Sequence, residues 1–224
     1  MSRTTDQKNP WTSFPATPPY VLDVDRPLVE EHNARRSQQH RFRLDLLPEP
    51  YMGPADAPVV LLNLNPGFAE QDIVDYSAPD RQEMMRQSLT HELADSDAFY
   101  FLADTFEGTG GGRWWKKRLA PLIRRVGVEA VSGKTQVIEH VPYKSRSFHD
   151  LPTLPSQGYS FSLVRNAISR DALIVVMRKY RSWIKAVPEL EAANVHQLRS
   201  PQNVTIGPGN CPTGFDVILE RMSS

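Results

Sequence analysis

The chain has a single cysteine, no net charge and no long apolar run, and each of these absences excludes a class of protein. Cys211 alone cannot build a disulfide scaffold, a zinc site of several cysteines or a four-cysteine iron–sulfur cluster. The 26 basic residues equal the 26 acidic ones, so net charge does not indicate a nucleic-acid partner, although the cations are clustered. No apolar span of membrane length and no apolar leader after Met1 are present. We therefore expect a cytoplasmic protein without membrane contact.

Short apolar segments alternate with segments of helical pattern along the chain. The apolar stretches at residues 59–64, 137–141, 173–177 and 195–198 predict buried strands, and helices are predicted at 25–41, 110–125, 160–169 and 216–222. A further helix is predicted after Pro79 with Asp80 as its cap, whereas residues 98–102 fit a strand or a helix equally well. Nearly all-apolar strands that alternate with helices predict an α/β fold with a parallel sheet covered on both faces.

The length of 224 residues suits one domain with one sizeable core. Residues 1–20 are polar and contain Pro10, Pro15, Pro18 and Pro19, so a poorly ordered arm is expected there. Residues 21–224 are then expected to form a single domain, since no internal repeat divides them.

The first predicted strand ends abruptly in Asn65-Pro66-Gly67-Phe68. In an open α/β sheet, ligands bind at the carboxyl ends of the strands. The Asn65 amide, the Gly67 N–H and the Phe68 ring are therefore expected at the mouth of a pocket, where the amide could hold a water or read the edge of a base. An ordinary Asn-Pro-Gly turn is the alternative.

Three further polar segments, at residues 142–147, 177–181 and 199–203, follow the other predicted strands, and all three carry cations. Such a rim suits a ligand that contains phosphate. Gly108 to Gly112 begin a helix and could favour an anion or form a plain flexible turn. The six histidines have no metal-ligand spacing, so no metal and no cofactor is expected, and His140 is the one that ends a strand. No Gly-x-Ser-x-Gly sequence surrounds Ser200, which argues against a serine hydrolase.

Four of these segments, taken in order, resemble motifs of the uracil-DNA glycosylase superfamily, especially its mismatch-specific and single-strand-selective branches. Residues 63–67 resemble the Gly-x-Asn-Pro-Gly motif, and residues 112–115 resemble Gly-x-Arg-Phe-Trp. Residues 139–142 stand in the place of Asn-x-x-Pro, and residues 198–203 keep the Ser-Pro and the Asn of the last motif, His-Pro-Ser-Pro followed by a basic residue and Asn. The matching pieces span roughly residues 45–222 in the right order.

The resemblance implies a three-layer α/β/α sandwich with a central four-stranded parallel sheet, and a pocket for a base flipped out of single- or double-stranded DNA. Asn65 and Ser200 would be catalytic, with Asn65 positioning the attacking water. The base pocket would consist of Gly67, Phe68, Glu139 and His140. Phosphate and DNA contacts would come from Lys144, Ser145, Arg146, Arg113, Arg199 and Asn203. Val204 and Ile206 would form a wedge that enters the vacated stack.

The chain departs from the family pattern at three positions. Leu198 replaces the histidine that stabilises charge on the leaving base, and Asn63 replaces a glycine. The asparagine that reads uracil is replaced by Glu139, or by His140 if the register slips by one residue. An ionised Glu139 would only accept hydrogen bonds and would repel the O4 of uracil. Three hypotheses follow: a metal-independent DNA glycosylase-like hydrolase, a nucleic-acid-binding protein with the same fold but no activity, and a protein that binds a free nucleoside or nucleotide.

Overall fold

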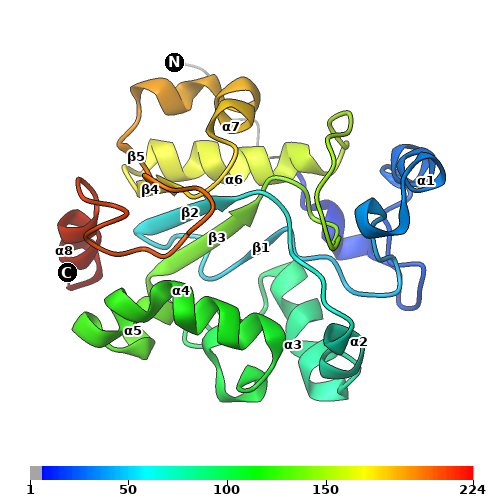
Figure 1. Ribbon diagram of the computed structural model, residues 1–224, viewed down its shortest axis with the longest axis horizontal. Helices are drawn as coiled ribbons and strands as arrows, with labels where there is room; N and C mark the ends of the chain where they lie inside the picture. The colour runs from blue at the N-terminus through cyan, green and yellow to red at the C-terminus, as the bar shows by residue number, and fades with distance from the viewer. Residues whose placement is uncertain (1–6, 224) are drawn as a thin grey trace.

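The computed structural model describes residues 7–223 and has an α/β fold built on one five-stranded sheet (Figure 1). The strand order is β1-β3-β2-β4-β5. The strands are β1 (Tyr51–Met52), β2 (Val59–Asn63), β3 (Thr135–Glu139), β4 (Leu173–Val176) and β5 (Val195–Gln197). Strands β2 to β5 are parallel to their neighbours, whereas β1 pairs with β3 in the antiparallel direction. The four predicted parallel strands are present, but the expected strand count was wrong because β1 adds a fifth strand at the edge.

Helices cover both faces of the sheet (Figure 1). α6 and α7 lie over one face, and α3, α4 and α5 lie under the other (Figure 1). The helix bounds are α1 (Arg26–Arg35), α2 (Gln71–Asp75), α3 (Pro79–Thr90), α4 (Gly110–Val126), α5 (Val128–Gly133), α6 (Gln157–Ser169), α7 (Tyr180–Ala186) and α8 (Phe215–Ser223). This arrangement is compatible with three layers. Among residues 7–223, no helix is both long and apolar enough to cross a membrane.

Alternate residues of the central strands enter two separate cores. Leu61 of β2 packs in a core with residues of α4 and α8, such as Leu119 and Ile218. Val60 of the same strand packs in the opposite core with residues of α6 and α7, such as Val164 and Trp183. Every residue of β2 is buried, as expected for a central parallel strand covered on both faces.

The segment before residue 21 belongs to the fold in its described part. Trp11 is 1% exposed, and Asn9 donates from its side chain to the carbonyl of Leu89 and to the hydroxyl of Tyr51. The expected boundary of a poorly ordered arm at residue 20 therefore does not hold for residues 7–20, and residues 1–6 lie outside the described chain. Burial of the Trp11 side chain in the core orders this segment in spite of its many prolines.

Two local expectations need correction. α3 begins at Pro79, so its cap residue is Ala78 and Asp80 lies inside the first turn. The ambiguous stretch at residues 98–102 contains a short 3-10 helix, Tyr100–Leu102, whose rings are buried on the α4 side of the sheet.

Candidate functional site

The carboxyl ends of β2, β3 and β4 open into one cavity of about 560 Å³. Asn63 and Glu139, the last residues of β2 and β3, line its buried part, and Arg178 lines it just after β4. The loops after β2 and β3 contribute Asn65 and Ser145. Aromatic side chains complete the lining: Phe68, Tyr76, Phe101, Trp114 and Trp115. The cavity lies where the α/β topology predicts a ligand.

The Asn65 side chain is held in one orientation by the residues around it. Its Nδ2 donates to the Ser145 hydroxyl at 3.0 Å and to the Pro66 carbonyl at 3.1 Å, and it lies 3.5 Å from the Tyr143 carbonyl. Carbonyl oxygens only accept, so the nitrogen of the amide must face them. No described residue donates to Oδ1. The amide oxygen is therefore a fixed acceptor that remains available at the cavity.

Asn63 and Glu139 form a polar pair across the two central strands. They are register partners, and Asn63 Nδ2 donates to Glu139 Oε1 at 3.0 Å. Asn63 is 4% exposed and Glu139 is 2% exposed. The second oxygen of each side chain, Asn63 Oδ1 and Glu139 Oε2, is buried and has no hydrogen-bond partner among the described residues. Trp183 fixes the backbone of the pair from the other face of the sheet, because its Nε1 donates to the Asn63 carbonyl at 2.9 Å.

The carboxyl group of Glu139 is neutral at pH 7. Burial raises its pKa to about 8, while the hydrogen bond from Asn63 and the charges of Arg178 and Lys144 act in the opposite direction. Since Oε1 accepts from Asn63, the proton belongs on Oε2. The expectation of an ionised Glu139 that only accepts hydrogen bonds is therefore wrong: the neutral acid can donate one.

Lys144 is buried and forms an ion pair within the protein. It is 2% exposed and forms an ion pair with Glu49, which is 4% exposed. Its Nζ also lies 4.8 Å from the centroid of the Tyr76 ring. The expectation that Lys144 contacts phosphate is therefore wrong, because its charge is neutralised by a buried carboxylate. Ser145 is buried as well, and its hydroxyl holds Asn65, so it does not lie on an exposed phosphate-binding surface.

The glycines at the start of α4 allow close packing at the cavity wall. A Cβ on Gly111 would lie 2.3 Å from a ring carbon of Phe101 and 2.7 Å from the Tyr76 hydroxyl. The N–H groups of this helix start already have protein acceptors, since Gly110 donates to Asp75 and Gly112 to Thr109. Close aromatic packing, and not a free anion site, accounts for the glycine run.

Phe68 lies at the mouth of the cavity and is stacked against a cation. The Arg43 guanidinium is 4.1 Å from its ring centroid, and that of Arg146 is 5.9 Å away. Arg146 is exposed and pairs with Glu70 at 2.5 Å. Gly67 beside it is exposed, with open space where a Cβ would stand. The mouth therefore combines an aromatic ring, an open backbone position and two arginines that are paired with Asp45 and Glu70.

Arg178 is the one lining cation for which no ion pair is found within the described chain. Burial lowers its pKa, and its Nε has no hydrogen-bond partner among residues 7–223. A guanidinium of this kind is suited to an anionic or carbonyl group of a ligand.

The last sequence motif lies outside this cavity. Ser200 does not line it, and its hydroxyl lies near Gln202 and the Asn203 N–H. Ser200 is therefore not among the residues that line the cavity with Asn65. Val204 and Ile206 are 0% exposed in the core beside α4 and α8, so the expected wedge is wrong: these side chains stabilise the fold.

Other predicted site residues also lie elsewhere. His140 packs against Trp183 and Phe161, accepts a hydrogen bond at Nδ1 from Gln157 Nε2, and has a pKa lowered to about 4 by burial, so its expected place in the base pocket is wrong. Arg113, Arg199 and Asn203 are exposed and do not line the cavity. Their contact with DNA remains a prediction.

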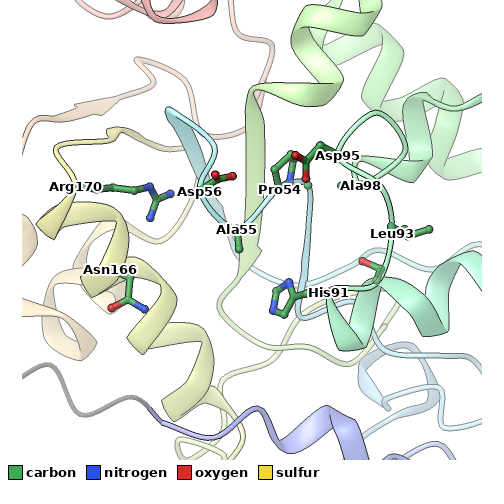
Figure 2. Close-up of a pocket in the computed structure, with 11 residues that line it drawn as sticks. Pro54, Ala55, Asp56, His91, Leu93, Asp95, Ala98, Asn166 and Arg170 are labelled. Atoms are coloured by element: carbon green, nitrogen blue, oxygen red, sulfur yellow. The ribbon is translucent and has the colours of Figure 1, made fainter.

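A second cavity, of about 370 Å³, lies before the amino ends of β2 and β4. Figure 2 shows Asn166 of α6 and Arg170, which follows α6, on one side of it and His91, Leu93 and Asp95 on the other. His91 stacks on Tyr51 at 4.4 Å between centroids, and burial lowers its pKa. This cavity lies at the opposite end of the sheet from Asn65.

Two parts of the cavity that contains Asn65 were not predicted from the sequence. Trp114, Trp115 and Phe101 form its walls, and the glycines before the tryptophans were the available signal. The buried Glu49–Lys144 pair had no local signal, because its members are 95 residues apart. Within residues 7–223, no group of three or more His, Cys, Asp or Glu could hold a metal ion. Comparison of the chain with family models, curated proteins and solved structures gives no match.

Proposed function

We propose that the protein hydrolyses the N-glycosidic bond of a nucleotide whose base enters the Asn65 cavity. The observation that carries this proposal is the Asn65 amide oxygen, which is fixed by three acceptors on its nitrogen and left free at a cavity with aromatic walls. A cavity of about 560 Å³ has room for a planar base, and ring faces are suited to stack on it.

In the proposed reaction, Asn65 Oδ1 accepts a hydrogen bond from a water and orients it toward the anomeric carbon. The water oxygen forms a bond to that carbon while the bond from carbon to the base nitrogen breaks. The base leaves with the electron pair, and the water proton passes to solvent or to the departing base. Asn65 orients the nucleophile and does not itself need to take the proton.

The negative charge that develops on the base needs a hydrogen-bond donor. Leu198 replaces the histidine that supplies this donor in the family that the sequence resembles, and it is buried in the core. The neutral Glu139 carboxyl has an unpartnered oxygen at the cavity and can donate to an acceptor on the base. One donor of this kind contributes about 2.7–4 kcal/mol to transition-state stabilisation.

The test is base release from single- and double-stranded oligonucleotides that carry uracil, hypoxanthine, xanthine or hydroxymethyluracil, with abasic sites as the readout. Asn65→Ala should slow release by about 100-fold or more, because the water loses its acceptor. Asn194→Ala is the matched control, since Asn194 is exposed and lies at the start of β5, away from the cavity. Failure of the folded wild-type protein to release any of these bases would contradict the proposal.

The second candidate is a protein of the same shape that binds nucleic acid without cutting it. The position of Ser200 favours it, because the second residue that was expected to be catalytic does not line the cavity with Asn65. In that case oligonucleotides bind, no base is released, and Asn65→Ala leaves the affinity unchanged. Binding of free nucleosides with no response to oligonucleotides would indicate the third hypothesis, a nucleoside- or nucleotide-binding protein.

A further inference from the structure

At the buried end of the cavity that contains Asn65, two polar atoms have no hydrogen-bond partner in the described chain. Asn63 Oδ1 and Glu139 Oε2 both have no hydrogen bond within the described chain, in residues that are 4% and 2% exposed. A buried polar group without a partner costs about 1–3 kcal/mol. Two such atoms on register partners, in residues that both line one cavity, indicate that a ligand completes their hydrogen bonds.

The chemical identity of each atom follows from the bond between the two side chains. Asn63 uses its Nδ2 to donate to Glu139 Oε1, so its remaining group toward the cavity is a carbonyl oxygen, which accepts. Among residues 7–223, Glu139 receives only this one hydrogen bond and contacts no cation within 4.0 Å. A carboxylate so poorly compensated is costly in a buried site, and the neutral acid, which donates from Oε2, is the stable form.

The charged and titratable groups that face Glu139 come from several elements. Glu49 precedes β1, Lys144 follows β3, Arg178 follows β4, and Tyr100 lies in the 3-10 helix under the sheet. Lys144 is already paired with Glu49, so it offers Glu139 little net charge. Arg178 favours the ionised form through space but makes no ion pair with Glu139.

We propose that Glu139 and Asn63 together determine the ligand specificity of this site: they recognise a neutral heterocycle that presents a hydrogen-bond acceptor next to an N–H group. Glu139 donates to the acceptor, and Asn63 accepts from the N–H. This inference rests on the proposed function for the identity of the ligand as a base. Ionisation of Glu139 turns the pair into two acceptors, so binding of neutral bases is lost as the carboxyl ionises.

The direct test measures binding of the free base uracil to the intact protein by calorimetry, at pH 6.5 and pH 9.5. With a Glu139 pKa of about 8, the neutral fraction falls about 30-fold by pH 9.5, and the affinity should fall to the same extent. Glu139→Gln is the isosteric control, because its amide accepts from Asn63 and donates to the ligand at every pH. At pH 6.5 this variant should bind uracil with an affinity within a few-fold of that of wild type. At higher pH its affinity should fall only as far as the ionisation of uracil itself requires.

Two further comparisons keep the inference falsifiable. Glu139→Leu removes the donor and should weaken binding about tenfold or more at pH 6.5, and 1,3-dimethyluracil, in which both ring N–H groups are blocked, should bind more weakly than uracil to the same degree. Circular dichroism establishes that each variant is folded. The inference is overturned if wild-type affinity is the same at both pH values, if Glu139→Gln binds as poorly as Glu139→Leu, or if 1,3-dimethyluracil binds as well as uracil.

Failure of this inference and failure of the proposed function give different results. Base release that depends on Asn65 but not on Glu139 would overturn the specificity pair and leave the hydrolase intact. Pair-dependent binding of uracil without release from any oligonucleotide would support the specificity pair and contradict hydrolysis.

Discussion

Asn65 illustrates how one side chain can be both structural and reactive. Its nitrogen is bonded to the loop after β3, which ties together the ends of two strands, while its oxygen is left to the cavity. Substitution by aspartate would place a negative oxygen against the Pro66 carbonyl, so only an amide serves both purposes.

Glu139 makes the stability of the protein depend on pH in a defined direction. The pKa of its carboxyl is about 8 when folded and near the ordinary 4.5 when unfolded. Between these values the unfolded chain loses a proton that the folded chain keeps, so Glu139 lowers stability progressively as pH rises from about 4.5 to 8. Glu139→Gln has no carboxyl group that can ionise at this position. Its melting temperature should therefore exceed that of wild type by a margin that grows from about pH 4.5 to 8 and is constant above pH 8.

Thermal unfolding of both proteins across pH 4.5–9 checks this expectation. Glu129→Gln serves as the control for loss of a carboxyl group, because Glu129 is exposed on α5. A margin for Glu139→Gln that shrinks with rising pH would contradict a neutral, buried Glu139.

At this scale, the sequence identified the residues that end a strand or begin the loop after it. Asn65 and Glu139 were predictable because parallel strands end at one edge of the sheet. Ser200 and His140 were misplaced, since β5 is short and lies at the sheet edge, and His140 points into the opposite core beside Trp183. Val204 and Ile206 follow an exposed turn, but apolar side chains in a loop are buried when neighbouring helices leave space for them.

At the scale of elements, strands were predictable where four or more apolar residues follow one another, as in β2 and β4. β3 begins two residues earlier than expected because Thr135 and Gln136 are polar but fully buried. β1 has only two residues, which is too short for any periodic signal. It forms because its partner β3 would otherwise be an unpaired edge.

The start of α4 sets the shape of the cavity wall, and a single methyl group should disturb it. In Gly111→Ala the new Cβ would overlap Phe101 and Tyr76, so we expect a loss of about 1–3 kcal/mol in the free energy of unfolding. Ligand binding should weaken as well, because both aromatic side chains line the cavity.

Gly133→Ala, at the end of α5, is the matched substitution. A Cβ there meets nothing within 4 Å, so alanine should be neutral or stabilise the protein by up to about 1 kcal/mol. Urea denaturation measures both variants. Equal effects of the two substitutions would mean that the contact at Gly111 does not limit the packing of α4.

At the scale of the whole molecule, zero net charge is matched at the cavity mouth, where the arginines are paired with Asp45 and Glu70. Arg43 and Arg146 lie at Phe68, and Arg178 lies further inside. Only a few phosphates of a nucleic acid can therefore be neutralised. The logarithm of the binding constant should fall with the logarithm of salt concentration with a slope of about −2 to −3, shallower than for proteins that make 6–10 phosphate contacts.

Arg178→Gln should weaken oligonucleotide binding and reduce the magnitude of this slope by about one. Arg125→Gln is the control, because Arg125 is exposed at the far end of α4. Fluorescence anisotropy of a labelled oligonucleotide at several salt concentrations gives the slopes. An unchanged slope in Arg178→Gln would exclude a phosphate contact at this residue.

The four tryptophans divide into two pairs according to their surroundings. Trp114 and Trp115 line the main cavity, whereas Trp11 and Trp183 are fully buried outside it. A planar guest that enters the cavity would quench or shift the emission of the first pair and leave that of the second as a constant background. The unmodified protein thus contains its own optical reporter of occupancy, and titration with unlabelled compounds can be followed from the indole signal alone.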